Sequence, residues 1–476
     1  MSTFIDPKSV RGKVQALMPQ AKDDLAQLVA FKSVADPKQF PPDECRRAAD
    51  WLLEAFGGLG FEDIATHPTP DGSKAVIGHK PGPKDAPTVL LYCHYDVQPP
   101  LGEAAWETPV WQLTEKDGRW YGRGASDCKG NIVVHLAALR ALGDDLPCTV
   151  KLVAEGSEEQ GTGGLEAFVP DHADLLRADA IVIADTGNFA VGKPAATTSL
   201  RGIANVVVSV STLSTSVHSG MFGGPAPDAL AVLAEMLATL HDEHGNTTIR
   251  GLARDQKWAG AAYPEEAFRA DARLLDGVDL VGDGTVSDLL WARPAVTVLG
   301  IDCPPVVGSS AALQATARAR LNLRVPPGTG GKEAQDALVA HLQAVTPWHA
   351  RVEIEREALG DPFVASIDGP AFTALSAAME DAYGRKPTTL GQGGSIPLCN
   401  VLQNTYPDGE IMLIGVEEPR CHIHAPNESV DPTEIENMAV TEAMFLQRYA
   451  NSQQANLSDT ARTGNGLGRL DSAAAA

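Results

Sequence analysis

Three short apolar segments, separated by stretches of helical periodicity, restrict this chain to a small set of folds. They are Thr88–Tyr92, Thr149–Ala154 and Ala180–Ala184. Between the first two, residues Asn131–Leu142 carry apolar side chains at helical spacing. Strands that alternate with helices indicate an α/β domain, in which helices cover both faces of a mostly parallel sheet.

Polar residues follow each of these segments. His94 comes after the first, Glu158 and Glu159 after the second, and Asp185 after the third. Polar ligands gather beyond the carboxyl ends of parallel strands. Together with Asp127 and His424, these side chains suit a divalent ion such as zinc or manganese. Singly, each has a structural explanation, such as a solvated turn or a helix cap, so the prediction of a metal site rests on the whole set.

The pattern changes after Arg201. Strand and helix signals then follow in the order β-α-β-β-α-β, which predicts a ferredoxin-like α+β domain. The segments are Gly202–Val210, Ala226–Leu240, Ala312–Val325, Lys332–Val345 and His349–Glu355. Signals resume at Ala371–Tyr383 and Glu410–Gly415. We therefore expect a larger domain at 1–200 and 357–450, an inserted domain at 201–356, and a disordered tail at 451–476. Residues 242–293 resist assignment.

Charge and cysteine usage narrow the class of protein. Lys and Arg number 38 against 61 Asp and Glu, a net charge of −23. Such a surface repels nucleic acid and anionic membranes, so we expect neither as a partner. No apolar run is long enough to cross a bilayer. The seven cysteines are dispersed without a C-x-x-C pair, and the N-terminus lacks a signal-peptide pattern, so a cytoplasmic location is expected.

A series of motifs resembles a known family. In order they are YCHYDVQP (92–99), YGRGASDCKG (121–130), AEGSEEQG (154–161), VHSGMFGG (217–224), GGSIP (393–397) and HAPNE (424–428). The chain resembles the co-catalytic metallopeptidases that include aminoacylases, carboxypeptidase G and carnosinases. It is most similar to the branch of cytosolic non-specific dipeptidases and carnosinases, over about residues 30–450.

The resemblance implies two divalent metal ions per subunit, zinc or else manganese. His94 and Asp185 would hold one ion, Glu159 and His424 the other, and Asp127 would bridge both. Glu158 would be the general base, and Asp96 would orient the cluster. A cis peptide bond is implied between Asp127 and Cys128. Cys128 itself departs from the family, whose members in this branch often carry Asp there.

The resemblance also assigns roles in the inserted domain and beyond it. His218 would stabilise the oxyanion from the partner subunit of a homodimer, and Arg324 would bind the substrate's terminal carboxylate. Gly394 and Ser395 would line the substrate pocket. The residues alone allow simpler readings: His218 as a surface residue, Arg324 as an outward-facing strand residue, and GGSIP as a tight turn.

The implied function is metal-dependent hydrolysis of dipeptides or similar small peptides. Alternatives in the same family are deacylation or desuccinylation of N-acyl amino acids, and carboxypeptidase activity. An alternative of another class is a non-catalytic metal-binding scaffold. The sequence lacks the G-x-S-x-G of serine hydrolases and the H-E-x-x-H of zincins.

Overall fold

The computed structural model describes residues 6–144 and 146–464, and the chain divides into two compact units. Unit 1 comprises Met1–Thr198, Ala365–Thr389 and Val401–Ala476. Unit 2 comprises Ser199–Val364 and Leu390–Asn400. The second piece of unit 2 lies outside the expected span of 201–356. It joins unit 2 because the backbone N–H of Arg201 donates to the carbonyl of Gln392, and the Ser395 hydroxyl donates to the carbonyl of Arg201.

Unit 1 is built on a mixed, mostly parallel sheet with the strand order β1-β2-β6-β3-β7-β17-β8. Its strands are β1 (Glu62–Pro68), β2 (Lys74–Lys80), β3 (Thr88–His94), β6 (Thr149–Glu155), β7 (Ala180–Ala184), β17 (Glu410–Ile414) and β8 (Ala195–Leu200). The central strands β6, β3, β7 and β17 run parallel, and their side chains are almost entirely buried. The three predicted strands are therefore confirmed, and their carboxyl ends meet at one edge.

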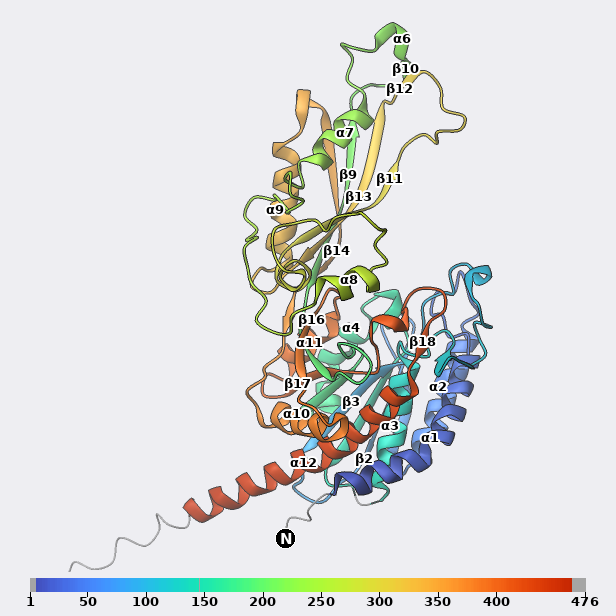
Figure 1. Cartoon of the computed structure of the whole chain (residues 1–476), viewed down its shortest axis with the longest axis vertical. Coiled ribbons are helices and arrows are strands. Elements are labelled where there is room, and N and C mark those ends of the chain that lie inside the picture. The colour runs from blue at the N-terminus through green and yellow to red at the C-terminus, as the bar shows by residue number, and fades with distance from the viewer. Residues whose placement is uncertain (1–5, 145, 465–476) are drawn as a thin grey trace, which may run out of the picture. The chain divides into compact units, whose positions relative to one another are not determined.

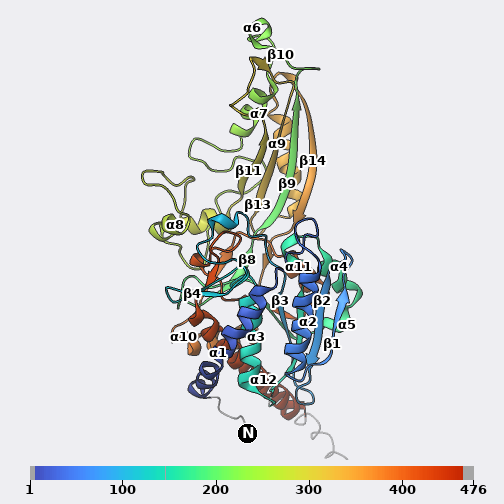
Figure 2. The ribbon, with the colours of Figure 1, turned by 90° about the vertical axis from the view of Figure 1, so that its right-hand side faces the viewer.

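Helices flank this sheet, as Figures 1 and 2 show. They are α1 (Pro7–Ala30), α2 (Asp43–Gly57), α3 (Lys129–Leu142), α4 (Gly164–Asp171), α5 (Ala173–Leu176), α10 (Pro370–Tyr383) and α12 (Pro432–Gly464). Helices α1, α3, α10 and α12 contact one another, and their apolar faces share one core with the sheet. The predicted helix at 131–142 is α3, which ends where Gly143 takes a positive φ of 71°.

Unit 2 contains an antiparallel sheet of order β11-β13-β9-β14. Its elements are β9 (Gly202–Ser211), α7 (Ala229–Ala238), β11 (Ala295–Asp302), β13 (Thr316–Val325), α9 (Gly331–Ala344) and β14 (Arg351–Gly360). Apolar residues of α7 and α9 pack with the sheet into a second core. The β-α-β-β-α-β order is as predicted, but its second strand, β11, lies outside the five segments that the sequence singled out. The expected strand at 312–325 is interrupted, because the backbone N–H of Gln314 donates to the Asp228 carboxylate, which separates β12 (Ala312–Leu313) from β13.

Short elements complete the chain. They are β4 (Thr114–Lys116), β5 (Arg119–Tyr121), β10 (Val217–His218), α6 (Ser219–Phe222), α8 (Glu265–Asp271), β15 (Phe363–Val364), β16 (Thr388–Gln392), α11 (Pro397–Thr405) and β18 (Ser429–Val430). Helix α12 runs to Gly464, past the expected start of a disordered tail, since residues 451–463 contain neither Pro nor Gly. The rest of that tail, 465–476, lies outside the described residues. Among the described helices, none is long and apolar enough to cross a membrane.

Candidate active site

The polar residues predicted at strand ends come together in unit 1. His94 ends β3, Asp185 follows β7 directly, and Glu158 and Glu159 lie in the turn after β6. Asp127 lies two residues before the start of α3, and His424 lies between β17 and β18. Parallel pairing places His94 beside Glu155 and Ala184 beside Ile414. The shared strand edge therefore brings residues from all along unit 1 into one cluster.

Asp127 lies between the two histidines. Its Oδ1 is 2.9 Å from Nε2 of His94, and its Oδ2 is 2.9 Å from Nε2 of His424. Nε2 of His94 is also 3.1 Å from Oδ1 of Asp185, and Nε2 of His424 is 3.1 Å from Oε2 of Glu159. The Asp127 carboxylate thus offers one oxygen to each of two neighbouring positions. One position also has His94 and Asp185, and the other has His424 and Glu159.

Asp96 fixes the turn that carries the two adjacent glutamates. Its Oδ1 accepts the backbone N–H of Glu158 at 3.1 Å, and its Oδ2 accepts that of Glu159 at 3.0 Å. The same carboxylate lies 3.4 Å from Nδ1 of His94, whose ring nitrogen is also 3.1 Å from the Asp96 carbonyl. This contact orients the imidazole so that Nε2 faces the cluster.

Asp71, in the loop between β1 and β2, holds the same turn from its other side. Its Oδ2 accepts hydrogen bonds from the hydroxyls of Ser157 at 2.7 Å and Thr162 at 2.5 Å. These two residues flank Glu158 and Glu159 in the chain. The hydrogen bonds outweigh burial and hold the pKa of Asp71 well below its usual range. No local pattern indicates this role of Asp71, because its partners lie 86 and 91 residues away in the chain.

Glu428 holds the loop that presents Asp127. Its Oε1 accepts the backbone N–H groups of Ser126 and Asp127, at 3.0 and 3.1 Å. Its Oε2 accepts the N–H of Gly124 at 2.9 Å and pairs with the Arg123 guanidinium at 2.7 Å. Glu428 belongs to the HAPNE motif that begins with His424, so one segment supplies a histidine and anchors the Asp127 loop.

The buried carboxylates of the cluster carry more negative charge than its histidines can neutralise. Burial, then the charge of Asp185, raises the pKa of Glu158 well above its usual value. Burial, then Asp127, raises the pKa of Glu159 to about 7. Conversely, hydrogen bonds to Asp127 and Glu159 overcome burial and raise the pKa of His424 to about 11. Divalent cations would relieve this excess of negative charge, and the imidazole and carboxylate donors suit zinc or manganese.

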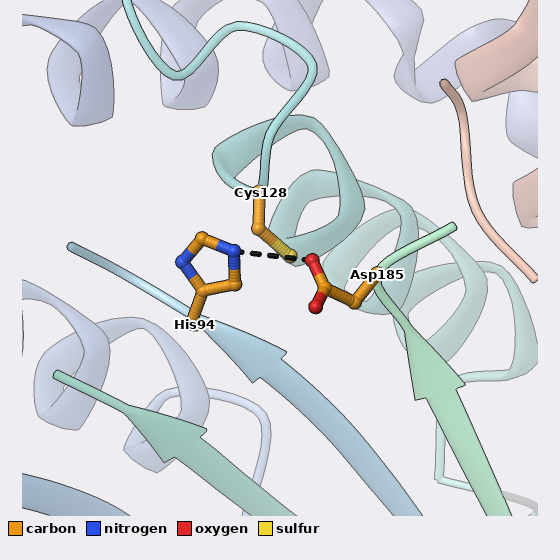
Figure 3. A group of neighbouring side chains, drawn as sticks. All are labelled: His94, Cys128 and Asp185. Carbon is orange, nitrogen blue, oxygen red and sulfur yellow. Dashed lines mark hydrogen bonds and ion pairs between the residues drawn. The ribbon is translucent and has the colours of Figure 1, made fainter. Parts of the chain in front are cut away.

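Cys128 lies against the pair formed by His94 and Asp185, as Figure 3 shows. The ligand atoms of the three residues lie within 4.8 Å of one another. The Sγ hydrogen bonds to the carbonyl of Ala184 at 2.9 Å, and burial raises the pKa of the thiol. The peptide bond between Asp127 and Cys128 is cis, as the resemblance implied.

Glu417 is an acidic neighbour that the sequence did not single out. It is buried, and it forms with Asp127 and Asp185 a third group of oxygens within 4.8 Å. Burial, then Asp127, raises the pKa of this carboxyl well above its usual value. A protonated Glu417 can donate a hydrogen bond to a neighbouring carboxylate. No motif marked this residue, because only the parallel pairing of β17 with β7 brings it near the cluster.

The predicted substrate-binding residues lie in unit 2. Ser395 is bonded to the backbone of Arg201, and Arg201 also packs against Gly393, next to Gly394. Arg324 is on β13, opposite Ile203 of β9. His218 is exposed, and its Nδ1 accepts the backbone N–H of Gly220 at 3.1 Å, so the neutral ring carries its proton on Nε2.

This fold and this cluster define a hydrolase of the metallopeptidase type. Residues 90–448 match the peptidase family M20/M25/M40, and the chain belongs to that family. A cysteinylglycine-S-conjugate dipeptidase of Corynebacterium striatum is 44% identical over 436 residues, 90% of this chain and 94% of that protein. A beta-Ala-His dipeptidase of Rattus norvegicus is 29% identical, over 77% of this chain and 79% of its own.

A solved structure shares the fold. The di-peptidase Dug1p of Saccharomyces cerevisiae superposes with a TM-score of 0.80 at 23% identity, covering 95% of this chain and 99% of that one. The likeness therefore extends over both units and confirms the predicted fold class.

Proposed function

We propose that this protein hydrolyses dipeptides and similar small peptides with two divalent metal ions. The observation that carries the proposal is the Asp127 carboxylate, which gives one oxygen to the side of His94 and the other to the side of His424. In the proposed arrangement His94 and Asp185 hold one ion, Glu159 and His424 hold the other, and Asp127 bridges them. The dipeptidase names of the relatives support the substrate class.

The protein's own residues supply the proton transfers. Bound ions would polarise the scissile carbonyl and lower the pKa of a water to about 7 or below. Glu158, which is fixed through its backbone by Asp96, accepts the proton of the attacking water and passes it to the leaving amine. His218 donates its Nε2 hydrogen to the oxyanion, and Arg324 pairs with the terminal carboxylate. In the same proposal, Gly394 and Ser395 line the substrate pocket.

We propose zinc as the resident ion, with manganese as the alternative, and a cytoplasmic location. The described cysteines are all free thiols, which is consistent with a reducing compartment. In the same family the chain could instead deacylate or desuccinylate N-acyl amino acids, or act as a carboxypeptidase. A complete set of site residues argues against a non-catalytic scaffold.

The experiment that tests the function is an assay of metal-depleted and reconstituted protein. Dipeptides, tripeptides, N-acyl amino acids and N-succinyl amino acids serve as substrates. We expect dipeptide hydrolysis to be lost on chelation and restored by zinc or manganese, with dipeptides preferred over the other classes. Preferred turnover of acylated amino acids, or no restoration by either ion, would contradict the proposal.

We further propose a homodimer in which His218 completes the active site of the partner subunit. The outer strand β11 has a free edge in the described chain, and its apolar side chains Val298, Leu299 and Ile301 are between 41 and 56% exposed. Met221 and Phe222, which lie three and four residues after His218 in the chain, are also exposed. An apolar strand edge of this kind is suited to burial against a second copy.

Mixing two inactive variants tests this dimer. His218→Ala and Glu158→Ala are dissociated together and reassociated. In a mixed dimer one site has both an intact Glu158 and an intact His218, so random exchange recovers activity at roughly a quarter of all sites. If His218 acted within its own chain, the mixture would stay as inactive as the separate variants. A particle that is monomeric under assay conditions would also exclude the dimer.

A further inference from the structure

Glu159 is held at three points by the segment that follows β3. Its backbone N–H donates to Oδ2 of Asp96 at 3.0 Å. The Gln98 side chain holds the other two points: its Nε2 donates to the carbonyl oxygen of Glu159 at 3.2 Å and to Oε2 of the Glu159 carboxylate at 2.8 Å. Both of these partners are acceptors, so the amide nitrogen of Gln98, and not its oxygen, faces Glu159. The backbone and the carboxylate of Glu159 are therefore fixed together.

The segment that carries Gln98 is itself anchored on both sides of this residue. The backbone N–H of Val97 donates to the carbonyl of Ser33 at 3.0 Å. The carbonyl of Pro99 accepts a hydrogen bond from the Arg123 guanidinium at 3.1 Å, and the proline ring restricts the backbone there. The Gln98 amide therefore extends from a rigid support toward Glu159.

The neighbouring Glu158 is held differently. Its backbone N–H donates to Oδ1 of Asp96, and its carbonyl oxygen accepts the N–H of Gly161 at 2.9 Å. Within residues 6–144 and 146–464, no group forms a hydrogen bond with the Glu158 carboxylate itself. A metal ligand has to keep one orientation, whereas a general base moves between the attacking water and the leaving amine. The two adjacent glutamates thus differ in freedom as their two proposed roles require.

The two proposed metal positions also differ in how far protein encloses them. The His94 side chain is 0% exposed, whereas the His424 side chain is 52% exposed. Glu159, which shares the position of His424, has a side chain that is 3% exposed. An exposed histidine loses more conformational freedom when it binds an ion. The position at His424 therefore depends more strongly on a carboxylate that is already oriented.

We propose that Gln98 is the positioning residue that fixes Glu159 as a metal ligand and thereby sets the metal affinity of the position shared with His424. The inference rests on the proposed function and extends it to the different roles of the two glutamates. The hydrogen bond from Gln98 keeps the Glu159 carboxylate turned toward Nε2 of His424, which is 3.1 Å from Oε2. Loss of a hydrogen bond to a ligating side chain typically lowers metal affinity by roughly 10–100-fold.

Zinc titration of the metal-depleted, full-length protein against a chromophoric chelator tests the proposal. We expect two zinc ions per chain in the wild type. Gln98→Met keeps the length of the side chain and removes the donor, so the weaker zinc affinity falls roughly 10–100-fold while the stronger affinity stays within about two-fold of the wild type. Gln98→Asn keeps the amide but is one methylene too short to reach, and it is expected to show the same loss.

Gln160→Met is the matched control. Gln160 follows Glu159 directly and is half-buried, and within the described part of the chain its side chain forms no hydrogen bond. Both zinc affinities of this variant are expected to stay at the wild-type values. A general effect of substitution in this turn would lower them as well.

Kinetics at different zinc concentrations give a second readout. At saturating zinc, kcat of Gln98→Met is expected to return to within about three-fold of the wild type, because Glu158 is unchanged. A residue with a purely structural role would not show this dependence on zinc. The variant Glu158→Gln is expected to behave in the opposite way, with both ions bound and a kcat that added zinc does not restore.

Wild-type zinc affinities in both Gln98→Met and Gln98→Asn would overturn the proposal. An equal loss at both metal positions, or a kcat that saturating zinc does not restore, would also overturn it. A wild-type protein that bound two zinc ions and hydrolysed no dipeptide would contradict the proposed function alone, since the zinc affinities would still decide the role of Gln98. A wild-type protein that bound fewer than two ions would contradict both.

Discussion

Replacement of Glu158 by Gln is expected to lower kcat by about 10²–10⁴-fold while both metal ions stay bound. In the proposed arrangement Glu159, and not Glu158, is the metal ligand. Nε2 of His424 is 3.1 Å from the Glu159 carboxylate, whereas the turn holds Glu158 by its backbone N–H through Asp96. An amide in place of the Glu158 carboxylate cannot accept the water's proton. Metal analysis of the purified variant and steady-state kinetics on dipeptides measure the two effects.

Glu155→Gln is a matched control for this variant. Glu155 ends the strand that leads into the same turn, and it accepts a hydrogen bond from the Tyr92 hydroxyl at 2.9 Å. Burial raises the pKa of Glu155 to about 8, so near neutral pH the carboxyl is mostly protonated and an amide resembles it closely. The control is expected to keep both metal ions and most activity. Loss of a metal ion from Glu158→Gln, or a rate near that of the wild type, would contradict the assignment of Glu158 as the general base.

Replacement of Asp127 by Ala is expected to release both metal ions together. The two Asp127 oxygens lie 2.9 Å from the two histidines, so the change removes one ligand from each proposed position. It also removes the negative charge shared by the two ions, so the ions would repel each other without compensation. The metal content should fall from two ions per chain toward zero. Because bound metal stabilises the folded state, added zinc should also raise Tm less than in the wild type.

The variant Asp185→Ala distinguishes a bridged pair of metal ions from two independent metal sites. Asp185 lies 3.1 Å from His94 and so belongs to one proposed position only. This variant is expected to bind one metal ion with lower affinity and to keep the other bound. Equilibrium dialysis against increasing zinc concentrations would measure both affinities. If Asp127→Ala lost one ion and bound the other with normal affinity, two separate mononuclear sites would replace the proposed bridged pair.

Much of the fold could be predicted because hydrophobic periodicity is a local property. The apolar runs at 88–92, 149–154 and 180–184 became β3, β6 and β7, and the order of signals after Arg201 became the antiparallel sheet and two helices of unit 2. Residues 242–293 could not be assigned, since they contain little regular structure beyond α8 and one turn of π-helix. Apolar side chains among them line a pocket in unit 2, which no local pattern predicts.

The sequence by itself predicted most of the polar residues that gather at the strand ends of unit 1. His94, Glu158, Glu159 and Asp185 each follow a strand, and parallel strands bring their carboxyl ends to a common edge. Only the tertiary structure decided what holds that cluster in place and what surrounds it. Asp71, Glu417 and Glu428 act through residues far away in the chain, as when Glu428 binds the backbone of Asp127, 301 positions earlier. The position of Arg324 opposite Ile203 likewise depends on the register of two antiparallel strands. The spacing of residues in the sequence predicts local secondary structure. Contacts between residues far apart in the chain depend on how the folded strands and loops pack against one another.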